Sequence, residues 1–198
     1  MKKIELIWRE LLYQALEKGE NHFVQKDLAW QFNCSTSTIF QALKAPRKMG
    51  AVKVGGRKFI LEDPEKLLYH WASVRSLKKE ILYQTRVDLP VLEIESSLIP
   101  EVIFGGFSAF RLRFKDFPAD YDQVWVYLKE KDQPLIKQRF PQKKGTPNLW
   151  ILKADPYLKK YGETTTLGQT FVDLWNLDVW YAKEFTQALK EKIDEILS

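Results

Sequence analysis

Cysteine and histidine are almost absent from this sequence, which contains only Cys34, His22 and His70. A single cysteine cannot form an intramolecular disulfide or a cysteine-rich metal site. Two histidines that lie far apart in the sequence do not suggest a zinc centre. These absences exclude a disulfide-stabilised scaffold, and we expect no metal ion or other cofactor.

Long hydrophobic runs are also missing. No stretch reaches the 18 or so uncharged apolar residues that would suggest a membrane span. The N-terminus begins with Lys2 and Lys3, but Glu5, Arg9 and Glu10 interrupt the apolar run that a signal peptide requires. We therefore expect a cytoplasmic protein that does not associate with membranes.

The residues that are present are those of a folded protein with a basic surface. Hydrophobic residues make up 45% of the 198 positions, and seven Trp and twelve Phe supply material for a packed core. The net charge of +5 favours an acidic partner such as nucleic acid. The length allows one domain or two small ones.

The N-terminal third has the pattern of three helices followed by a hairpin. Apolar residues recur at helical spacing over residues 3–18 and 24–32, and Gly19 is a suitable stop for the first helix. Ser35 can cap a third helix. Gly55-Gly56 separates two short strand-like runs. This order is typical of a winged helix-turn-helix, which we assign to residues 1–62.

The third helix is expected to place Ile39, Phe40 and Leu43 on its core-facing side, and Pro46 is expected to end or kink it. Apolar spacing after Asp63 predicts a connector helix over residues 63–86.

The remaining residues, 87–198, read as a mixed α/β domain, so the fold class is α+β. The strand-like segments are VIFGG, VWVYL and LWILKA, and SAFRLRF is expected to be a short helix. Residues 137–148 are expected to form a basic loop, and the sequence after Thr166 to form two helices.

The charge distribution points to DNA. No acidic residue occurs between Leu28 and Leu61, whereas six basic residues do. Hydroxyl side chains at the start of the third helix can donate to phosphates, and Gln41 can read an adenine edge. The predicted contacts with double-stranded DNA are Thr36, Ser37, Thr38, Gln41, Lys44, Arg47, Lys48, Arg57 and Lys58. The alternative is a winged helix that only docks another protein.

The stretch FGGFSAFRLRFKDFPADYDQVWVYL has the outline of a nucleotidyltransferase site. Gly105, Gly106 and Ser108 stand where such enzymes hold the triphosphate with backbone N–H groups. Asp120 and Asp122 alternate before a strand, an arrangement that can share Mg²⁺.

The outline is incomplete because the later strand LWILKA carries no carboxylate, and Asp155 comes only at its exit. A degenerate site on a related fold is therefore preferred. The alternatives are an active Mg²⁺- and NTP-dependent enzyme that modifies RNA or protein, and an ordinary turn with solvated acids.

The whole chain resembles the AbiE-type antitoxin family. The resemblance is carried by the winged helix, KLLYHWASVRS, FGGFSAF, VWVYL and TLGQTFVDLWNLDVWYAKEFTQAL. It implies a transcriptional regulator that represses its own type IV toxin–antitoxin (abortive infection) operon and opposes a nucleotidyltransferase toxin. It also implies a nucleotidyltransferase-like C-terminal domain without catalysis. The Asp120-Tyr121-Asp122 sequence departs from that pattern.

The sequence therefore predicts a DNA-binding regulator that occupies an operator, either as a homodimer or as two molecules side by side. The basic segment could extend the DNA contact through Lys137, Arg139, Lys143 and Lys144, although an ordinary solvated loop is preferred. A third class, a pure interaction module, would use exposed Trp175, Trp180 and Tyr181. Their helical spacing instead favours the core.

Overall fold

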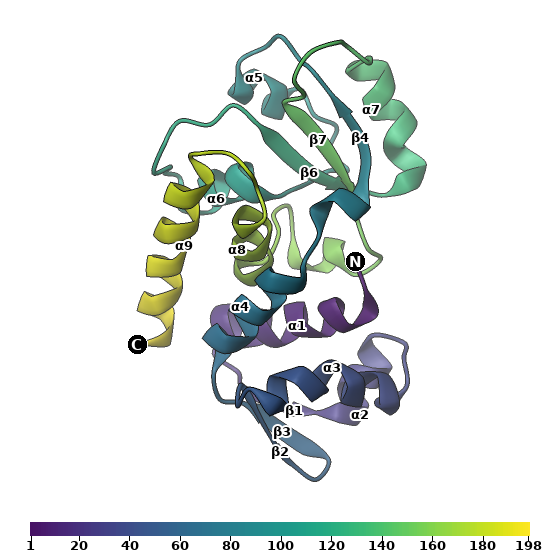
Figure 1. Ribbon diagram of the computed structural model, residues 1–198. Helices are drawn as coiled ribbons and strands as arrows, with labels where there is room; N and C mark the ends of the chain where they lie inside the picture. The colour runs from purple at the N-terminus through teal and green to yellow at the C-terminus, as the bar shows by residue number, and fades with distance from the viewer. The chain divides into compact units, whose positions relative to one another are not determined.

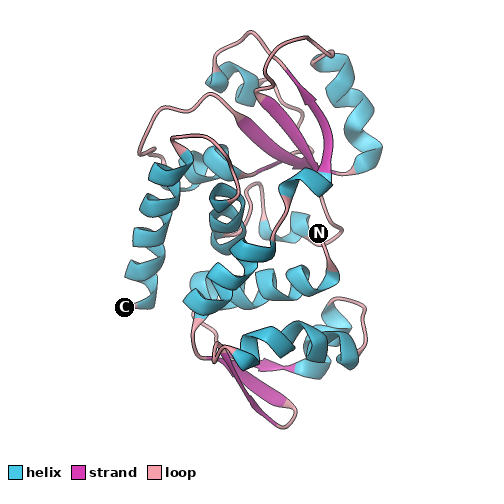
Figure 2. Cartoon of the chain, viewed as in Figure 1, coloured by secondary structure: helices cyan, strands magenta, loops and turns pink.

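The computed structural model describes residues 1–198 and has an α+β fold with nine α-helices and two small sheets (Figures 1 and 2). The chain divides into two compact units. Unit 1 comprises Met1–Arg75, Thr166–Val172 and Lys192–Ser198, and unit 2 comprises Ser76–Thr165 and Asp173–Glu191. No helix is both long enough and apolar enough to cross a membrane.

The first three helices of unit 1 begin and end close to their predicted residues. They are α1 (Lys3–Lys18), α2 (Gln25–Gln31) and α3 (Thr36–Lys48). Gly19 ends α1 with a φ of 69°, a conformation that glycine adopts without strain. Ser35 caps α3 because its side-chain oxygen accepts from the backbone N–H of Thr38 at 3.2 Å.

Helix α3 does not end at Pro46 but continues for two residues past it. The expectation for Phe40 was wrong, because its side chain does not face the core but is 48% exposed. The buried side of α3 consists of Ile39, Ala42, Leu43 and Pro46. Phe40 lies one residue after Ile39, about 100° further round the helix, so its ring turns to the exposed side.

The first sheet contains the predicted hairpin and one strand that was not predicted. Strands β2 (Val52–Gly55) and β3 (Lys58–Leu61) pair antiparallel around Gly56, whose φ is 69°. Strand β1 (His22–Val24) pairs with the other edge of β3. Its Phe23 stacks on Phe59 with ring centroids 5.3 Å apart. Three residues are too few to give a period-2 signal, so β1 is defined only by this pairing.

The predicted connector helix over 63–86 was wrong in its second half. Helix α4 covers only Pro64–Val74, capped by Asp63, and Arg75 is already extended. A 3-10 turn and strand β4 (Ile81–Thr85) follow. The apolar residues in this segment fit both the helical period and the strand period. The strand forms because β4 pairs with β7.

Unit 2 is built on a four-stranded mixed sheet in the order β4-β7-β6-β5. The three predicted strands are present as β5 (Ile103–Phe104), β6 (Val124–Leu128) and β7 (Leu149–Lys153). Strands β6 and β7 are parallel, and the outer pairs are antiparallel. Helices α5 (Val91–Ser96), α6 (Gly106–Phe114) and α7 (Gln133–Arg139) lie wholly in unit 2. Helices α8 (Leu167–Trp175) and α9 (Ala182–Leu197) each have residues in both units. The basic segment is therefore not wholly a loop, because Lys137 and Arg139 lie on α7.

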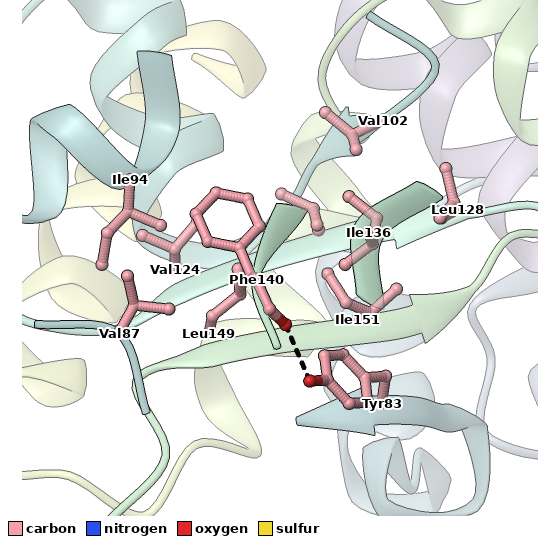
Figure 3. Packing of buried hydrophobic residues seen from close by; sticks show 11 residues of the cluster. Tyr83, Val87, Ile94, Val102, Val124, Leu128, Ile136, Phe140, Leu149 and Ile151 are labelled. Atoms are coloured by element: carbon pink, nitrogen blue, oxygen red, sulfur yellow. Dashed lines mark hydrogen bonds between the residues drawn. The ribbon is translucent and has the colours of Figure 1, made fainter. Parts of the chain in front are cut away.

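Alternate residues of β6 build the core of unit 2 (Figure 3). Val124, Val126 and Leu128 lie in one buried cluster with Ile94 of α5 and Ile136 of α7. Nearby, the Tyr83 hydroxyl donates to the Phe140 carbonyl oxygen at 2.8 Å, so its polar atom is satisfied within the cluster. The intervening β6 residues, Trp125 and Tyr127, face the other side of the sheet.

We expect His70 to make the stability of unit 1 dependent on pH. Burial lowers the pKa of this imidazole below 6.5, and its ring contacts Trp8 edge to face at 5.0 Å. A depressed histidine pKa means that the stabilisation is complete above pH 6.5 and is lost as pH falls toward the folded-state pKa. We expect the free energy of unfolding to fall between pH 7.5 and 5.5 by less than about 1.4 kcal/mol per pH unit, the limit for one proton. His70→Gln should reduce this slope in urea titrations, and an unchanged slope would exclude His70 as the cause.

Candidate nucleic-acid interface

The exposed side of α3 is polar and basic. The residues that line it recur at helical spacing and are Thr36, Ser37, Phe40, Gln41, Lys44, Arg47 and Lys48. None of them is acidic. Because the opposite side is held by buried apolar residues, the packing of α3 fixes which side chains remain accessible.

The N-terminus of α3 offers hydrogen-bond donors. Thr36 and Ser37 are exposed. Their backbone N–H groups lie in the first turn of α3 and therefore have no carbonyl acceptor within the helix. Thr38 is partly buried and its hydroxyl contacts Ser35 Oγ at 3.1 Å, so it serves the cap. Of the three predicted hydroxyl residues, two are therefore free to donate outward.

Of the six basic residues in the acid-free stretch, only Lys53 has a carboxylate partner, Glu62 at 3.6 Å. Lys44, Arg47, Lys48, Arg57 and Lys58 are all exposed. Arg57 lies in the turn of the β2–β3 hairpin, where its carbonyl oxygen accepts from Gln25 N–H at 3.2 Å. This bond ties the hairpin turn to the start of α2. The predicted cations thus lie on α3 and at the hairpin turn, unneutralised within the chain.

Two exposed aromatic residues of unit 1 were not predicted as part of this surface. Trp30 on α2 is 87% exposed, and Phe40 lies on the polar side of α3. The sequence signal was available, because Phe40 has polar or small residues one turn away on both sides, at Thr36 and Lys44. The apolar spacing of the helix instead predicts a core position for Phe40.

In unit 2, the paired glycines are buried by packing. Gly105 N–H donates to the Trp125 carbonyl oxygen at 2.9 Å, and a Cβ at Gly105 would come within 3.0 Å of Tyr127 Cε2. Gly106 has a φ of 50°, with Leu177 Cδ1 3.6 Å from its Cβ position. The Gly105 donor is committed to β6, and neighbouring side chains cover both glycines. Ser108 is also buried, and its hydroxyl has no hydrogen-bond partner.

The two aspartates lie in the loop that leads into β6, before the strand as the sequence predicts. Asp120 and Asp122 are exposed, whereas Tyr121 between them is buried. The Tyr121 hydroxyl donates to Glu95 Oε1 at 2.8 Å and accepts from Arg111 Nε at 2.9 Å. Burial and the Glu95 carboxylate raise the pKa of Tyr121.

Asp122 accepts a hydrogen bond from the Tyr181 hydroxyl. Burial, followed by this bond, raises the pKa of Tyr181. Asp155 accepts from the backbone N–H of Tyr157 at 3.0 Å. No group of three or more Asp, Glu, His or Cys side chains in the chain could hold a metal ion.

The remaining predicted surface residues separate into two groups. Lys143 and Arg86 both bond the Asp88 carboxylate and thereby lower its pKa, beside a cleft of about 590 Å³ that Arg139 also lines. Trp175 and Trp180 are exposed, contrary to the preference for the core, whereas Tyr181 is buried.

Among known proteins, the chain matches no protein-family model and no curated protein. The AbiE-type resemblance therefore rests on the sequence motifs alone.

Proposed function

We propose that unit 1 is a winged helix-turn-helix that binds double-stranded DNA. In this proposal α2 and α3 form the helix-turn-helix, and the β2–β3 hairpin is the wing. The observation that carries it is the set of five exposed cations on α3 and the hairpin turn, without a carboxylate partner or an intervening acid. Polyanionic DNA is the partner that such a surface fits.

The contacts follow from the chemistry of each group. Thr36, Ser37 and the free N–H groups of the first turn donate to a phosphate. Gln41, one turn further on, reaches a base edge, for which adenine N6 and N7 are the best match. Lys44, Arg47 and Lys48 bind phosphates along the groove, and the wing cations Arg57 and Lys58 bind beyond it.

Unit 2 is proposed to be nucleotidyltransferase-like and non-catalytic. A glycine pair, a helix, an aspartate loop and a buried strand follow in the order of such a fold. Three observations favour loss of catalysis. The Gly105 N–H is bonded to β6, the glycines are covered by packing, and Asp122 holds Tyr181. The alternative, an active Mg²⁺- and NTP-dependent enzyme, is supported only by the exposed carboxylate of Asp120.

The biological role proposed is transcriptional regulation in the cytoplasm. By the AbiE-type resemblance, the protein would be the autorepressing antitoxin of a type IV toxin–antitoxin operon, paired functionally with a nucleotidyltransferase toxin. Two copies on one operator would match a site with repeated halves.

The wing is tested by replacing Arg57 and Lys58 with alanine. Each lost phosphate contact makes the slope of log affinity against log salt less negative by about 0.9, so we expect a change of about 1.8. The measurement is a fluorescence anisotropy titration of a random-sequence 30-base-pair duplex between roughly 50 and 200 mM salt, the range over which phosphate contacts change affinity strongly. Lys78→Ala with Lys79→Ala removes the same charge from exposed positions of unit 2 and is the control. Equal slopes for both double variants would remove the wing from the interface.

A further inference from the structure

Phe40 is the only large apolar side chain on the exposed side of α3 (residues Thr36, Ser37, Gln41, Lys44, Arg47 and Lys48 make up the rest). It lies near the middle of this surface, with Thr36 one turn before it and Lys44 one turn after it. A phenylalanine that is 48% exposed among polar residues leaves apolar area in water. Contact with an apolar group of a ligand would therefore remove this ring area from water and stabilise the complex.

The ring is also held in a defined environment. The guanidinium carbon of Arg47, two turns along the same helix, lies 5.9 Å from the centroid of the Phe40 ring. A cation at this distance is attracted to the face of an aromatic ring. The contact restricts the rotamers of both side chains, so ligand binding costs less side-chain conformational entropy.

The chemistry of the DNA major groove limits which apolar group Phe40 can contact. Base edges there present hydrogen-bond donors, acceptors and a single apolar group, the C5-methyl of thymine. The phosphates that flank the groove are charged and give a phenyl ring no apolar contact. We infer that Phe40 packs on the C5-methyl group of a thymine, an inference that rests on the proposed DNA-binding function.

The neighbouring Gln41 is exposed on the same side and suits adenine. The two residues together select A·T pairs at the centre of the site read by α3. Arg47 then binds phosphate and also supports the Phe40 ring.

The experiment uses the full chain and a duplex that it selects from a random-sequence pool. Each thymine of the selected duplex is replaced in turn by deoxyuridine, which removes only the methyl group. For the parent protein we expect one position at which this lowers affinity roughly fourfold, the effect of one buried methyl-sized group. Phe40→Ala should bind the thymine and deoxyuridine duplexes equally, Phe40→Leu should keep part of the difference, and Gln41→Ala should keep all of it.

The outcomes separate the inference from the function on which it rests. If the parent protein selects and binds no duplex, the DNA-binding proposal and this inference both fail. If it binds but no deoxyuridine replacement matters, or Phe40→Ala keeps the thymine preference, only the inference is overturned. The parent titrations need no variant, and circular dichroism of Phe40→Ala and Phe40→Leu checks that both variants fold.

Discussion

Replacing Lys44, Arg47 and Lys48 together by alanine should lower the affinity for double-stranded DNA by two to three orders of magnitude. Each cation that neutralises a phosphate releases counterions, which contributes a factor of roughly eight at 0.1 M salt. Three such contacts on α3 contribute a factor of roughly 500, and their loss makes the salt slope less negative by about 2.7. Both quantities come from one set of anisotropy titrations over a range of salt concentrations.

The matched control is the triple variant Lys78→Ala, Lys79→Ala and Lys183→Ala, whose three lysines are all exposed in unit 2. It changes the net charge by the same amount but leaves α3 intact. A weakening confined to the α3 variant supports the interface. If both triple variants lose affinity equally, the binding depends on net charge alone and the α3 surface is wrong.

Trp71→Ala should destabilise the folded chain by about 3–5 kcal/mol, the range for removing a large aromatic residue from a core. Trp71 is fully buried on α4, and its indole Nε1 donates to Glu5 Oε2 on α1 at 3.1 Å. The same oxygen lies 3.4 Å from a guanidinium nitrogen of Arg75. Removing the indole leaves both a cavity and a buried carboxylate with one donor fewer, and each is costly.

Domains of this size have total stabilities of about 5–15 kcal/mol, so the change is a large share of the whole. We expect the urea midpoint, followed by far-ultraviolet circular dichroism, to fall by at least about 1 M. Trp30→Ala makes the same substitution at a residue that is 87% exposed and should change stability by no more than about 0.5 kcal/mol. Similar shifts for the two variants would contradict the assigned burial of Trp71.

The sequence was sufficient for the elements whose signals are local. Apolar spacing and Gly19 defined α1, Ser35 marked the start of α3, and Gly55-Gly56 marked the hairpin. The acid-free basic stretch was likewise visible without coordinates, because charge is a property of the residues themselves. The exposure of Lys44, Arg47 and Lys48 could be predicted because they occupy the polar side of a periodic helix.

Contacts between residues distant in the sequence decided the rest. Strand β1 exists through pairing with β3, and β4 through pairing with β7, where the sequence pattern had favoured a helix. Such pairing energy comes from partners that the local pattern does not contain.

Contacts between distant residues also distinguish the two candidate sites, the nucleic-acid surface of unit 1 and the nucleotide site of unit 2. Gly105 and Asp122 have the residue types of a nucleotide site, yet in the structure one donates to the Trp125 carbonyl oxygen and the other accepts from Tyr181. By itself, the sequence determined the fold class, the first three helices of unit 1 and the charge of α3. Only the tertiary structure decided which glycines, aspartates and aromatic rings remain free, because a hydrogen bond or a buried surface used in folding is no longer available to a ligand.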